Sequence, residues 1–391
     1  MSSALDRQWW LTLSFILFFS SRSPLNQPVS FSLVSPSTMN ESTDPSEKEL
    51  TFPQVGMTFG TGKFKWKVER AIYSGPFSDV FVLTDMNNKR KKYAMKCERV
   101  VGIVRPVLKL DAMVLPLMNG RRGFPEYITS GRTSTFKYLV MQLLGPDIGK
   151  LRKVMSCGRF SLHTAINVGL QSLTLLEELH GAGWLCRDVK APNLATGLGA
   201  ESGTIFMLDF GFARRFMTND NKERRPPRAS AALMGTMPYA SIAAHCMREQ
   251  CPKDDIESWF YMLIELMTGK LPWKELPHKT ILEYKQHIRN AGYREFFSTL
   301  PPQFKDVMRS IDTCDFYVQP DYELIRYLIL AAAEHLGANL DKPMDWVADR
   351  LLYERASKLG DDVSEVPCDN EKTDRDANLE SHNIKILGAV A

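Results

Sequence analysis

Short segments of mainly apolar, β-branched and aromatic residues between polar turns mark the first third of the folded region as strand-rich. Residues 66–72 (WKVERAI), 79–83 (DVFVL) and 92–96 (KYAMK) are such segments, and this composition is typical of strands. Turn-forming polar segments at residues 74–76 and 87–90 separate them. Because strands joined by such short turns pair antiparallel, we predict an antiparallel meander.

A helical period dominates the remainder of the folded region. Apolar residues recur at positions 162, 166, 170, 173, 176 and 179, which predicts a helix over residues 161–180 with Ser161 as its N-cap and Gly181 at its end. Residues 255–268 are apolar almost all round, so this helix is expected at the centre of a helical lobe. The predicted fold class is therefore α+β, with two lobes: a small antiparallel β-rich N-terminal lobe and a larger, mainly helical C-terminal lobe.

Both ends of the chain lack this periodicity. The periodic pattern begins near Lys65, after a Ser-, Pro- and Thr-rich segment that predicts a flexible lead-in. Beyond Tyr353 the chain has mixed charges and no aromatic residue, so it is not expected to order itself. We predict an N-terminal extension over residues 1–57, one domain over residues 58–350 and a disordered tail over residues 351–391.

An apolar run lies near the start of the chain, at residues 9–19 (WWLTLSFILFF). It has the length of a signal-peptide core and is too short to span a bilayer. No A-x-A cleavage pattern accompanies it. Signal cleavage, retention of the segment and initiation at Met39 all stay open, and membrane contact is not expected.

Composition narrows the classes of partner and compartment. The 391 residues include 24% charged and 44% hydrophobic residues, and the net charge of +4 is too small to indicate nucleic-acid binding. The seven cysteines include no CxxC pair, which favours a reducing compartment. We expect a monomeric protein in the cytoplasm, with the nucleus as the alternative location.

Two short segments carry the candidate chemistry: CRDVKAPN, which begins at Cys186, and DFG, which begins at Asp209. In this pattern Asp188 would accept the proton of a substrate hydroxyl, while Asn193 and Asp209 would hold Mg²⁺. Lys96, at the end of YAMK, would neutralise phosphate charge. Each feature alone is usually a surface turn or a solvated lysine. Together, in this order, they predict phosphoryl transfer with ATP and Mg²⁺ as cofactors.

Longer phrases of the sequence extend these motifs: VMQLLGPDI (140–148), VKAPN (189–193), RRPPRA (224–229), GTMPYASIAAH (235–245), DDIESWFYMLIE (254–265), LPW (271–273) and PDYELI (from residue 320). With these phrases the chain resembles the casein kinase 1 superfamily of serine/threonine protein kinases, and within it most of all the tau-tubulin kinases. The resemblance covers about residues 58 to 348. It implies a two-lobed protein-kinase fold and protein substrates.

The resemblance also implies an ATP-binding site. Met141 would guard the back of the adenine pocket, and the backbone of Gln142 and Leu144 would hold the adenine edge. The side chains of Ile72 and Val80 would lie on either side of the adenine ring.

Other family positions concern the phosphates and the catalytic loop. Gly75 would belong to the phosphate-binding loop, and Lys190 would steady the transferring phosphate, which favours Ser and Thr acceptors. Asp255 would brace the catalytic loop from the buried helix. The residues SIA at 241–243 stand where the superfamily has its own substitute for the APE motif.

Three departures from the family pattern support a second interpretation. The glycine-rich loop keeps only Gly75 of three glycines, Asp111 replaces the expected glutamate of helix C, and Cys186 replaces the usual histidine. Asp111 is one methylene shorter, so it should reach Lys96 only if its helix moves inward, whereas Cys186 is interpreted as a packing residue rather than a reactive thiol. The alternative function is a catalytically weak pseudokinase that acts as a nucleotide-binding scaffold.

Substrate choice rests on two further features. Pro238 stands where the superfamily often has an anion-binding arginine, which predicts weaker recognition of pre-phosphorylated substrates. An arginine cluster in the activation segment would attract acidic or phosphorylated sequences, or would simply be a solvated basic loop. This arginine cluster consists of Arg214, Arg215, Arg224, Arg225 and Arg228. Acidic or cytoskeletal proteins are the expected partners.

Overall fold

The computed structural model describes residues 52–75, 77–100, 106–218, 220 and 222–359. The apolar run at residues 9–19, most of the lead-in and the end of the chain from residue 360 lie outside the described residues. The predictions made for those segments therefore stay predictions.

A six-stranded antiparallel sheet forms the N-terminal lobe, in the spatial order β1-β2-β3-β4-β6-β5. Its strands are β1 (Thr58–Thr61), β2 (Phe64–Ser74), β3 (Asp79–Asp85), β4 (Lys92–Arg99), β5 (Tyr127–Arg132) and β6 (Phe136–Gln142). The three predicted strands fall within β2, β3 and β4, so the predicted meander is confirmed.

The two faces of this sheet are buried against different partners. Tyr138 and Val140 on β6 join an apolar cluster with Trp66 of β2, whereas Leu139 between them joins the cluster that contains helix α1 (Leu108–Met118) and the helical lobe. Successive side chains of a strand point to opposite faces. The side chains on one face of β6 therefore pack within the sheet's own apolar cluster, and those on the other face pack in the cluster that contains α1.

The start of helix α1 is held by a buried carboxylate on β4. Glu98 Oε2 accepts hydrogen bonds from the backbone N–H of Val107 and of Leu108, both at 3.1 Å. Lys137 Nζ lies 2.8 Å from the other oxygen of Glu98. The carboxylate satisfies N–H groups that a helix start leaves without partners and interacts favourably with the helix dipole. This contact places α1 beside β4, the strand that carries Lys96.

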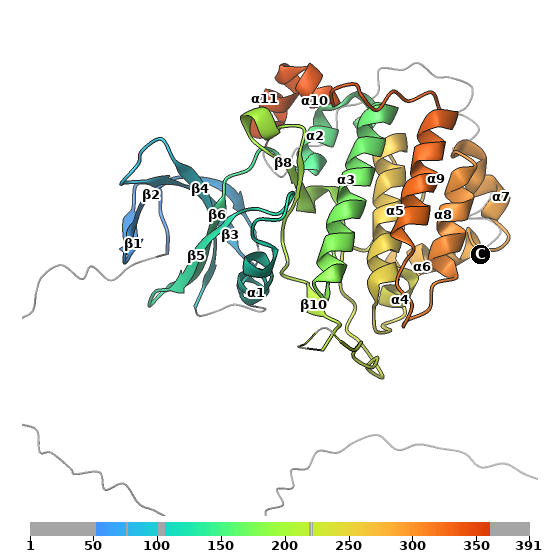
Figure 1. Cartoon of the computed structure of the whole chain (residues 1–391), viewed down its shortest axis with the longest axis horizontal. Coiled ribbons are helices and arrows are strands. Elements are labelled where there is room, and N and C mark those ends of the chain that lie inside the picture. Colours follow the sequence, from blue (N-terminus) through green and yellow to red (C-terminus); the bar gives the residue numbers. More distant parts are fainter. Residues whose placement is uncertain (1–51, 76, 101–105, 219, 221, 360–391) are drawn as a thin grey trace, which may run out of the picture. The chain divides into compact units, whose positions relative to one another are not determined.

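The C-terminal lobe is mainly helical (Figure 1). Its α-helices are α2 (Ile148–Val154), α3 (Leu162–Gly181), α4 (Ile242–His245), α5 (Pro252–Thr268), α6 (His278–His287), α7 (Tyr293–Phe296), α8 (Gln303–Asp312), α9 (Tyr322–His335), α10 (Asp345–Ala348) and α11 (Arg350–Lys358). Its 3₁₀ turns are η1 (Ser156–Gly158), η2 (Ala191–Asn193), η3 (Gly199–Glu201) and η4 (Phe297–Thr299). Its short strands β7 (Trp184–Leu185), β8 (Leu194–Thr196), β9 (Ile205–Met207) and β10 (Arg214–Arg215) form the pairs β7–β10 and β8–β9.

Helices α3 and α5 pack against each other at the centre of this lobe (Figure 1). Ser161 caps α3 by accepting a hydrogen bond from Thr164 N, and the helix ends at the predicted Gly181. Helix α5 is buried along nearly its whole length and ends at Gly269, which has φ +84°. Trp259 Nε1 of α5 donates a hydrogen bond to the carbonyl of Gly169 in α3 at 2.9 Å. Both predicted helices are confirmed.

The folded region extends beyond both limits that the periodicity indicated. Strand β1 precedes Lys65, and its Phe59 ring lies 5.5 Å from the Trp66 ring. At the other end, α11 continues past the predicted limit at residue 350, with Ala356 fully buried and the Tyr353 hydroxyl 3.2 Å from Gly197 O. The predicted tail therefore starts too early, because a few apolar side chains suffice to pack so short a helix on an existing surface.

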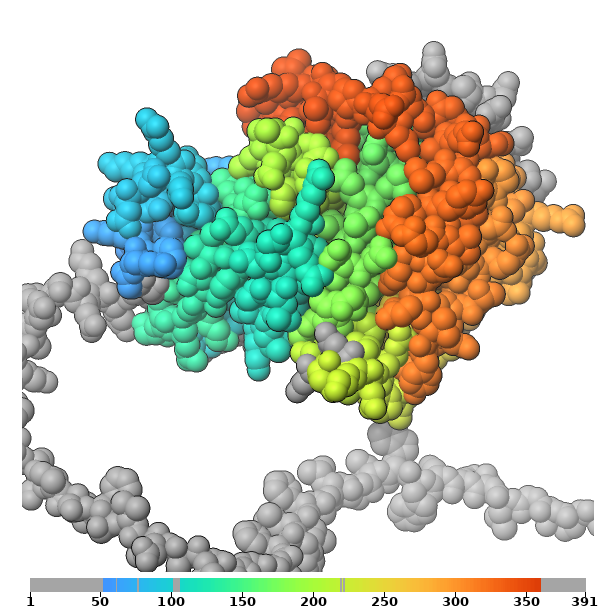
Figure 2. All heavy atoms as spheres, viewed as in Figure 1, coloured from blue at the N-terminus to red at the C-terminus, as the bar shows by residue number. Residues whose placement is uncertain are grey.

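The described part of the chain thus forms a two-lobed α+β fold. Figure 2 shows the residues of the first strands, in blue, as a smaller mass beside the larger mass of the helical lobe. Within the described ranges, no helix has the length and hydropathy needed to cross a membrane.

Candidate active site

Helix α5 holds the loop that follows β7. The carboxylate of Asp255 accepts hydrogen bonds from Cys186 N at 2.8 Å and from Arg187 N at 2.7 Å, as the predicted bracing role requires. Arg187 has φ 65°, a left-handed conformation that is costly for a residue with a side chain. Asp255 is 1% exposed, so these bonds to a charged acceptor form away from water and can hold the strained backbone.

A histidine that the sequence analysis treated only as the end of a helix completes this anchor. His180 Nε2 lies 2.7 Å from Asp255 Oδ2, and His180 Nδ1 lies 2.6 Å from the hydroxyl of Tyr322 on α9. The imidazole is buried. It therefore links the anchoring carboxylate to a third helix, a contact between distant segments for which the sequence holds no local signal.

The carboxylate of Asp188 is buried and has three side-chain partners. Lys190 Nζ lies 2.9 Å from Oδ2, Asn193 Nδ2 donates to Oδ2 at 3.0 Å, and Thr236 Oγ1 donates to Oδ1 at 2.7 Å. Lys190 Nζ also donates to Thr236 Oγ1 at 2.8 Å. The structure thus brings together Asp188, Lys190 and Asn193, the three predicted catalytic-loop residues.

Thr236 is not among the predicted site residues, although it lies in the phrase GTMPYASIAAH. The preceding Gly235 has φ +103°, and a Cβ atom there would lie 2.7 Å from Arg187 O. Only glycine fits this close approach without strain. A glycine followed directly by a threonine at the start of a turn is the local signal that could have indicated this contact.

Lys96 pairs with two carboxylates, Asp111 on the neighbouring α1 and Asp209 in the DFG segment of the helical lobe. Its Nζ lies 2.8 Å from Asp111 Oδ2 and 2.8 Å from Asp209 Oδ1. Asp111 Oδ1 also accepts a hydrogen bond from Phe210 N at 2.7 Å. The shorter Asp111 side chain therefore does reach Lys96, because α1 lies close to β4.

The charges of this trio are set by burial and mutual attraction. Burial opposes the ammonium form of Lys96, but Asp111 and Asp209 outweigh it and raise the pKa of Lys96 above its usual value. Burial raises the pKa of Asp111. For the more exposed Asp209, Lys96 outweighs burial and lowers the pKa. Asp209 is therefore the carboxylate that stays ionised most readily.

The oxygen atoms at this site suit Mg²⁺. Asp209 has φ 59°, and its Oδ1 accepts from Gly211 N at 3.0 Å; among the described residues its Oδ2 has no hydrogen-bond partner. Asn193 uses its amide nitrogen toward Asp188, which leaves its amide oxygen without a described partner. One carboxylate oxygen and one amide oxygen, together with phosphate oxygens, are ligands that Mg²⁺ accepts. The donor set fits the predicted metal-binding roles of Asn193 and Asp209.

The predicted adenine-pocket residues come from three strands and the segment after them. Val80 pairs with Lys96 across β3 and β4, and Ile72 lies in the irregular part of the β2–β3 ladder. Met141 lines a residual cavity of about 10 Å³ that Lys96 and Asp209 also line, and its place at the back of the adenine pocket stays a prediction. The backbone of Leu144 has no hydrogen-bond partner among the described residues, so it remains available for a ligand.

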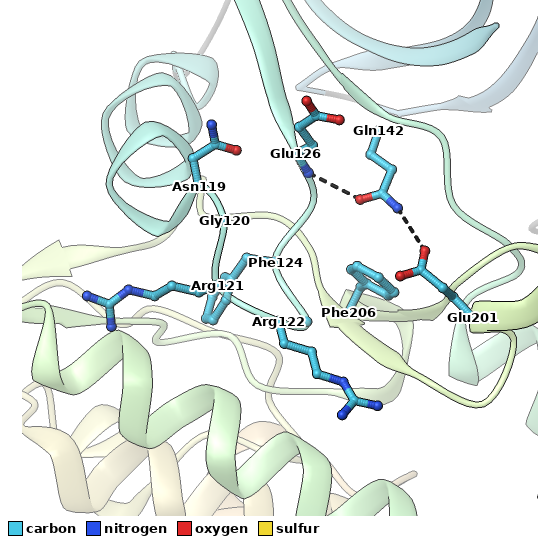
Figure 3. A pocket seen from close by; sticks show the side chains of 10 residues that line it. Asn119, Gly120, Arg121, Arg122, Phe124, Glu126, Gln142, Glu201 and Phe206 are labelled. Atoms are coloured by element: carbon cyan, nitrogen blue, oxygen red, sulfur yellow. Dashed lines mark hydrogen bonds between the residues drawn. The ribbon is translucent and has the colours of Figure 1, made fainter.

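The side chain of Gln142 faces a different hollow (Figure 3). Its Oε1 accepts from Glu126 N at 3.2 Å, and its Nε2 donates to Glu201 at 3.4 Å. This hollow of about 430 Å³ also contains Arg121 and Arg122. The predicted adenine contact of Gln142 therefore depends on its backbone alone.

The phosphate-loop candidate connects β2 and β3, and the structure describes its residues 73–75, 77 and 78. Gly75 N donates to Ser78 O at 3.1 Å, and Ser74 Oγ donates to Asp79. A Cβ atom on Gly75 would overlap the Tyr73 hydroxyl oxygen. The remaining glycine allows the Tyr73 ring to lie over the loop.

Two other predictions concern the surroundings of the site. Burial raises the pKa of the Cys186 thiol well above its usual value, which agrees with a packing role and not with a reactive thiolate. Arg214 Nε lies 2.6 Å from Glu249, and Arg228 pairs with the same carboxylate. In the described part of the chain, no group of three acidic, His or Cys side chains could bind a metal by itself.

The fold and the site define a protein kinase. No protein-family model matches the chain. It is 46% identical over 316 residues to serine/threonine-protein kinase spe-6 of Caenorhabditis elegans, an alignment that covers 79% of this chain and 83% of that protein. It is also 35% identical over 286 residues to a probable serine/threonine-protein kinase of Dictyostelium discoideum, covering 73% of this chain and 57% of that protein.

At this identity and coverage, the chain belongs to the serine/threonine protein kinases.

Proposed function

We propose that this protein transfers the γ-phosphate of ATP to serine and threonine hydroxyls of protein substrates. The observation that carries the proposal is the arrangement around Asp188, whose buried carboxylate is held by Lys190, Asn193 and Thr236. Such an arrangement orients a carboxylate toward an incoming hydroxyl, and orientation is most of what phosphoryl transfer requires from a protein.

Each residue has a distinct part in this reaction. Asp188 accepts the proton of the substrate hydroxyl, and Lys190, 2.9 Å from it, steadies the developing negative charge. Asn193 and Asp209 would hold the metal, and Lys96 would bind phosphate oxygens. When bound, ATP with Mg²⁺ supplies the phosphoryl group and neutralises its charge.

Two of the three departures from the family pattern no longer support the alternative function, a pseudokinase scaffold. Asp111 contacts both Lys96 and the backbone of Phe210, and Cys186 is a packed side chain. The eroded phosphate loop is the remaining departure, and it removes no metal ligand. We therefore propose an active enzyme.

Within the kinases, we propose a casein kinase 1-like enzyme, closest in sequence pattern to the tau-tubulin kinases. The segment SIA begins α4: Ser241 caps the helix by accepting from Ala244 N, and Ile242 N donates to Glu257 on α5 at 3.1 Å. This local anchor on α5 supports the assignment of SIA as the substitute for APE.

For the substrates, we propose acidic protein sequences, with cytoskeletal proteins as one source. The pKa of Arg187 is lowered to about 10, mainly by burial and next by the charge of the neighbouring Arg214. The charge of Arg228 acts in the same direction. Glu249 is the carboxylate that Arg214 and Arg228 share. An excess of positive charge beside Asp188 would attract acidic segments. The cytoplasm, with the nucleus as alternative, remains our expected location.

The test is Mg-ATP phosphotransfer to casein and to tubulin by the full chain and by its Asp188→Asn and Lys96→Met variants. We expect incorporation into serine and threonine by the wild type and its loss in both variants. Equal incorporation by all three proteins would overturn the catalytic proposal. Incorporation into casein but not tubulin would overturn only the cytoskeletal part.

A further inference from the structure

A lysine lies completely buried beneath the turn at residues 236–240 of the activation segment. Lys285 belongs to α6 and has 0% exposure. Its Nζ lies 4.6 Å from the centre of the Tyr261 ring and 5.7 Å from that of Trp273. A fully buried lysine is rare because removing its charge from water is costly. The surrounding groups must therefore offset that cost.

Three acceptors surround this nitrogen. Lys285 Nζ donates to Ala240 O at 2.6 Å and to Met237 O at 3.3 Å, and it lies 3.3 Å from His245 Nε2. An ammonium group has three N–H donors, and aromatic faces stabilise it further. These groups offset part of the cost of burying the charged lysine.

The same contacts hold the underside of the turn. Its third inward carbonyl, of Pro238, accepts from Trp273 Nε1 at 2.8 Å. The N–H groups of Tyr239 and Ala240 both donate to Thr236 O at 2.9 Å. From the opposite side of this turn, the Thr236 hydroxyl reaches Asp188 at 2.7 Å and accepts from Lys190. The turn therefore lies between Lys285 below and the catalytic loop above.

We propose that Lys285 is a positioning residue for phosphoryl transfer, whose ammonium group fixes the turn so that Thr236 stays on Asp188 and Lys190. This inference rests on the proposed kinase reaction. Lys285 itself touches neither the catalytic carboxylate nor the segments that bind ATP.

The charges around Lys285 give its action a pH dependence. Burial lowers the pKa of Lys285 to about 7, Glu257 on α5 opposes this shift, and Arg289 on α6 adds to it. Tyr261 donates to Glu257 and accepts from Arg289, so these three groups form one network.

His245 on α4 is the neighbour of Lys285 on the other side. Its pKa is lowered to about 4, mainly by burial and next by the charge of Lys285, and His278 acts in the same direction. His245 is therefore neutral near pH 7. Its Nδ1 lies 3.0 Å from His278 Nε2, so its Nδ1–H can donate there while Nε2 accepts from Lys285. Above pH 7 the lysine loses a proton and one of its three donors, and the hold on the turn weakens.

The test compares Lys285→Met with Lys279→Met, the same change on the same helix at a side chain that is 90% exposed. For Lys285→Met we expect kcat to fall on the order of 10- to 100-fold, as for other small misplacements of a reacting group, with an unchanged KM for ATP. Lys279→Met should match the wild type. Thermal unfolding of each variant shows whether it is folded at the assay temperature.

A double-mutant cycle with Thr236→Val separates positioning from general stability. If Lys285 acts through Thr236, the double variant should be no slower than the slower single variant. Fully additive losses of kcat would overturn the inference.

The pH profile provides a test that does not depend on the folding of Lys285→Met. The wild type should lose kcat as the pH rises above about 7, whereas Thr236→Val should lack this alkaline limb. An identical limb in both proteins, or no limb in the wild type, would overturn the inference. Wild-type activity in Lys285→Met beside an inactive Asp188→Asn would refute the role of Lys285 alone; an active Asp188→Asn would refute the proposed reaction.

Discussion

The catalytic loop and the phosphate loop of this kinase are held in opposite ways. The catalytic loop is held by residues of other segments. Asp255 of the central helix accepts hydrogen bonds from Cys186 N and Arg187 N. Thr236 of the activation segment donates a hydrogen bond to Asp188. The phosphate loop is held by its own hairpin, through Gly75 N to Ser78 O and Ser74 to Asp79.

Burial explains what this difference means for each loop. A buried N–H that loses its acceptor costs about 1–3 kcal/mol, because water cannot replace the lost bond. The phosphate loop is exposed, with Tyr73 40% and Phe77 37% accessible, so water can compensate there. The loss of two family glycines falls in this weakly held loop, where changes cost little stability. The following predictions test that contrast.

The largest effect is expected for Asp188→Asn. The amide keeps the shape of the side chain but cannot accept the hydroxyl proton, so kcat should fall on the order of 10²- to 10⁴-fold. The measurement is steady-state phosphotransfer, with Asp306→Asn on the surface of α8 as the matched control. Retention of more than a tenth of the activity would mean that the catalytic loop does not supply the base.

Asp255→Ala should disrupt both stability and activity. The change leaves Cys186 N and Arg187 N without their acceptor and removes the partner of His180 Nε2, so the free energy of unfolding should fall by about 3 kcal/mol or more. The strained Arg187 should then relax and displace Asp188. Chemical denaturation and kcat of the folded protein measure the two effects; an unchanged kcat would show that the loop keeps its shape without α5.

The adjacent Asp254 should behave differently, because it accepts from Cys251 N and not from the catalytic loop. Burial raises its pKa from 3.8 to about 6. Between these values the folded protein holds a proton that the unfolded chain has released, so stability falls as the pH rises.

Asp254→Asn cannot titrate, so its stability relative to the wild type should increase by about 3 kcal/mol between pH 4 and pH 7. Its kcat should equal that of the wild type. Denaturant unfolding at both pH values measures the difference, and parallel stability curves would contradict the assigned proton.

The smallest effect is expected for Gly75→Ala in the phosphate loop. The new Cβ would displace the exposed Tyr73 ring but no buried group, so kcat/KM for ATP should change only about twofold and thermal stability should not change. Phe77→Ala in the same loop is the control for simple loss of side-chain contact. A loss comparable to that in Asp255→Ala would show that the two loops are held equally firmly.

Local patterns predicted much of this molecule. Strands β2 to β4 follow from short apolar segments between polar turns, and helices α3 and α5 follow from the spacing of their apolar residues. CRDVKAPN and DFG contain the residues that we propose as the base and the metal ligands. The limits of the domain were less predictable. A short strand such as β1 and a short helix such as α11 depend on the surface they pack against rather than on their own pattern.

The sequence by itself determined the class of chemistry, because the residue types in the catalytic loop and DFG segment are adjacent or nearly so along the chain. Only the tertiary structure decided what holds them. Thr236 is 48 positions from Asp188, and His180 is 75 from Asp255. Whether Asp111 reaches Lys96 depends on where α1 packs, and the burial of Lys285 depends on α6 meeting the activation segment. Such contacts depend on the packing of whole elements, which no local period encodes.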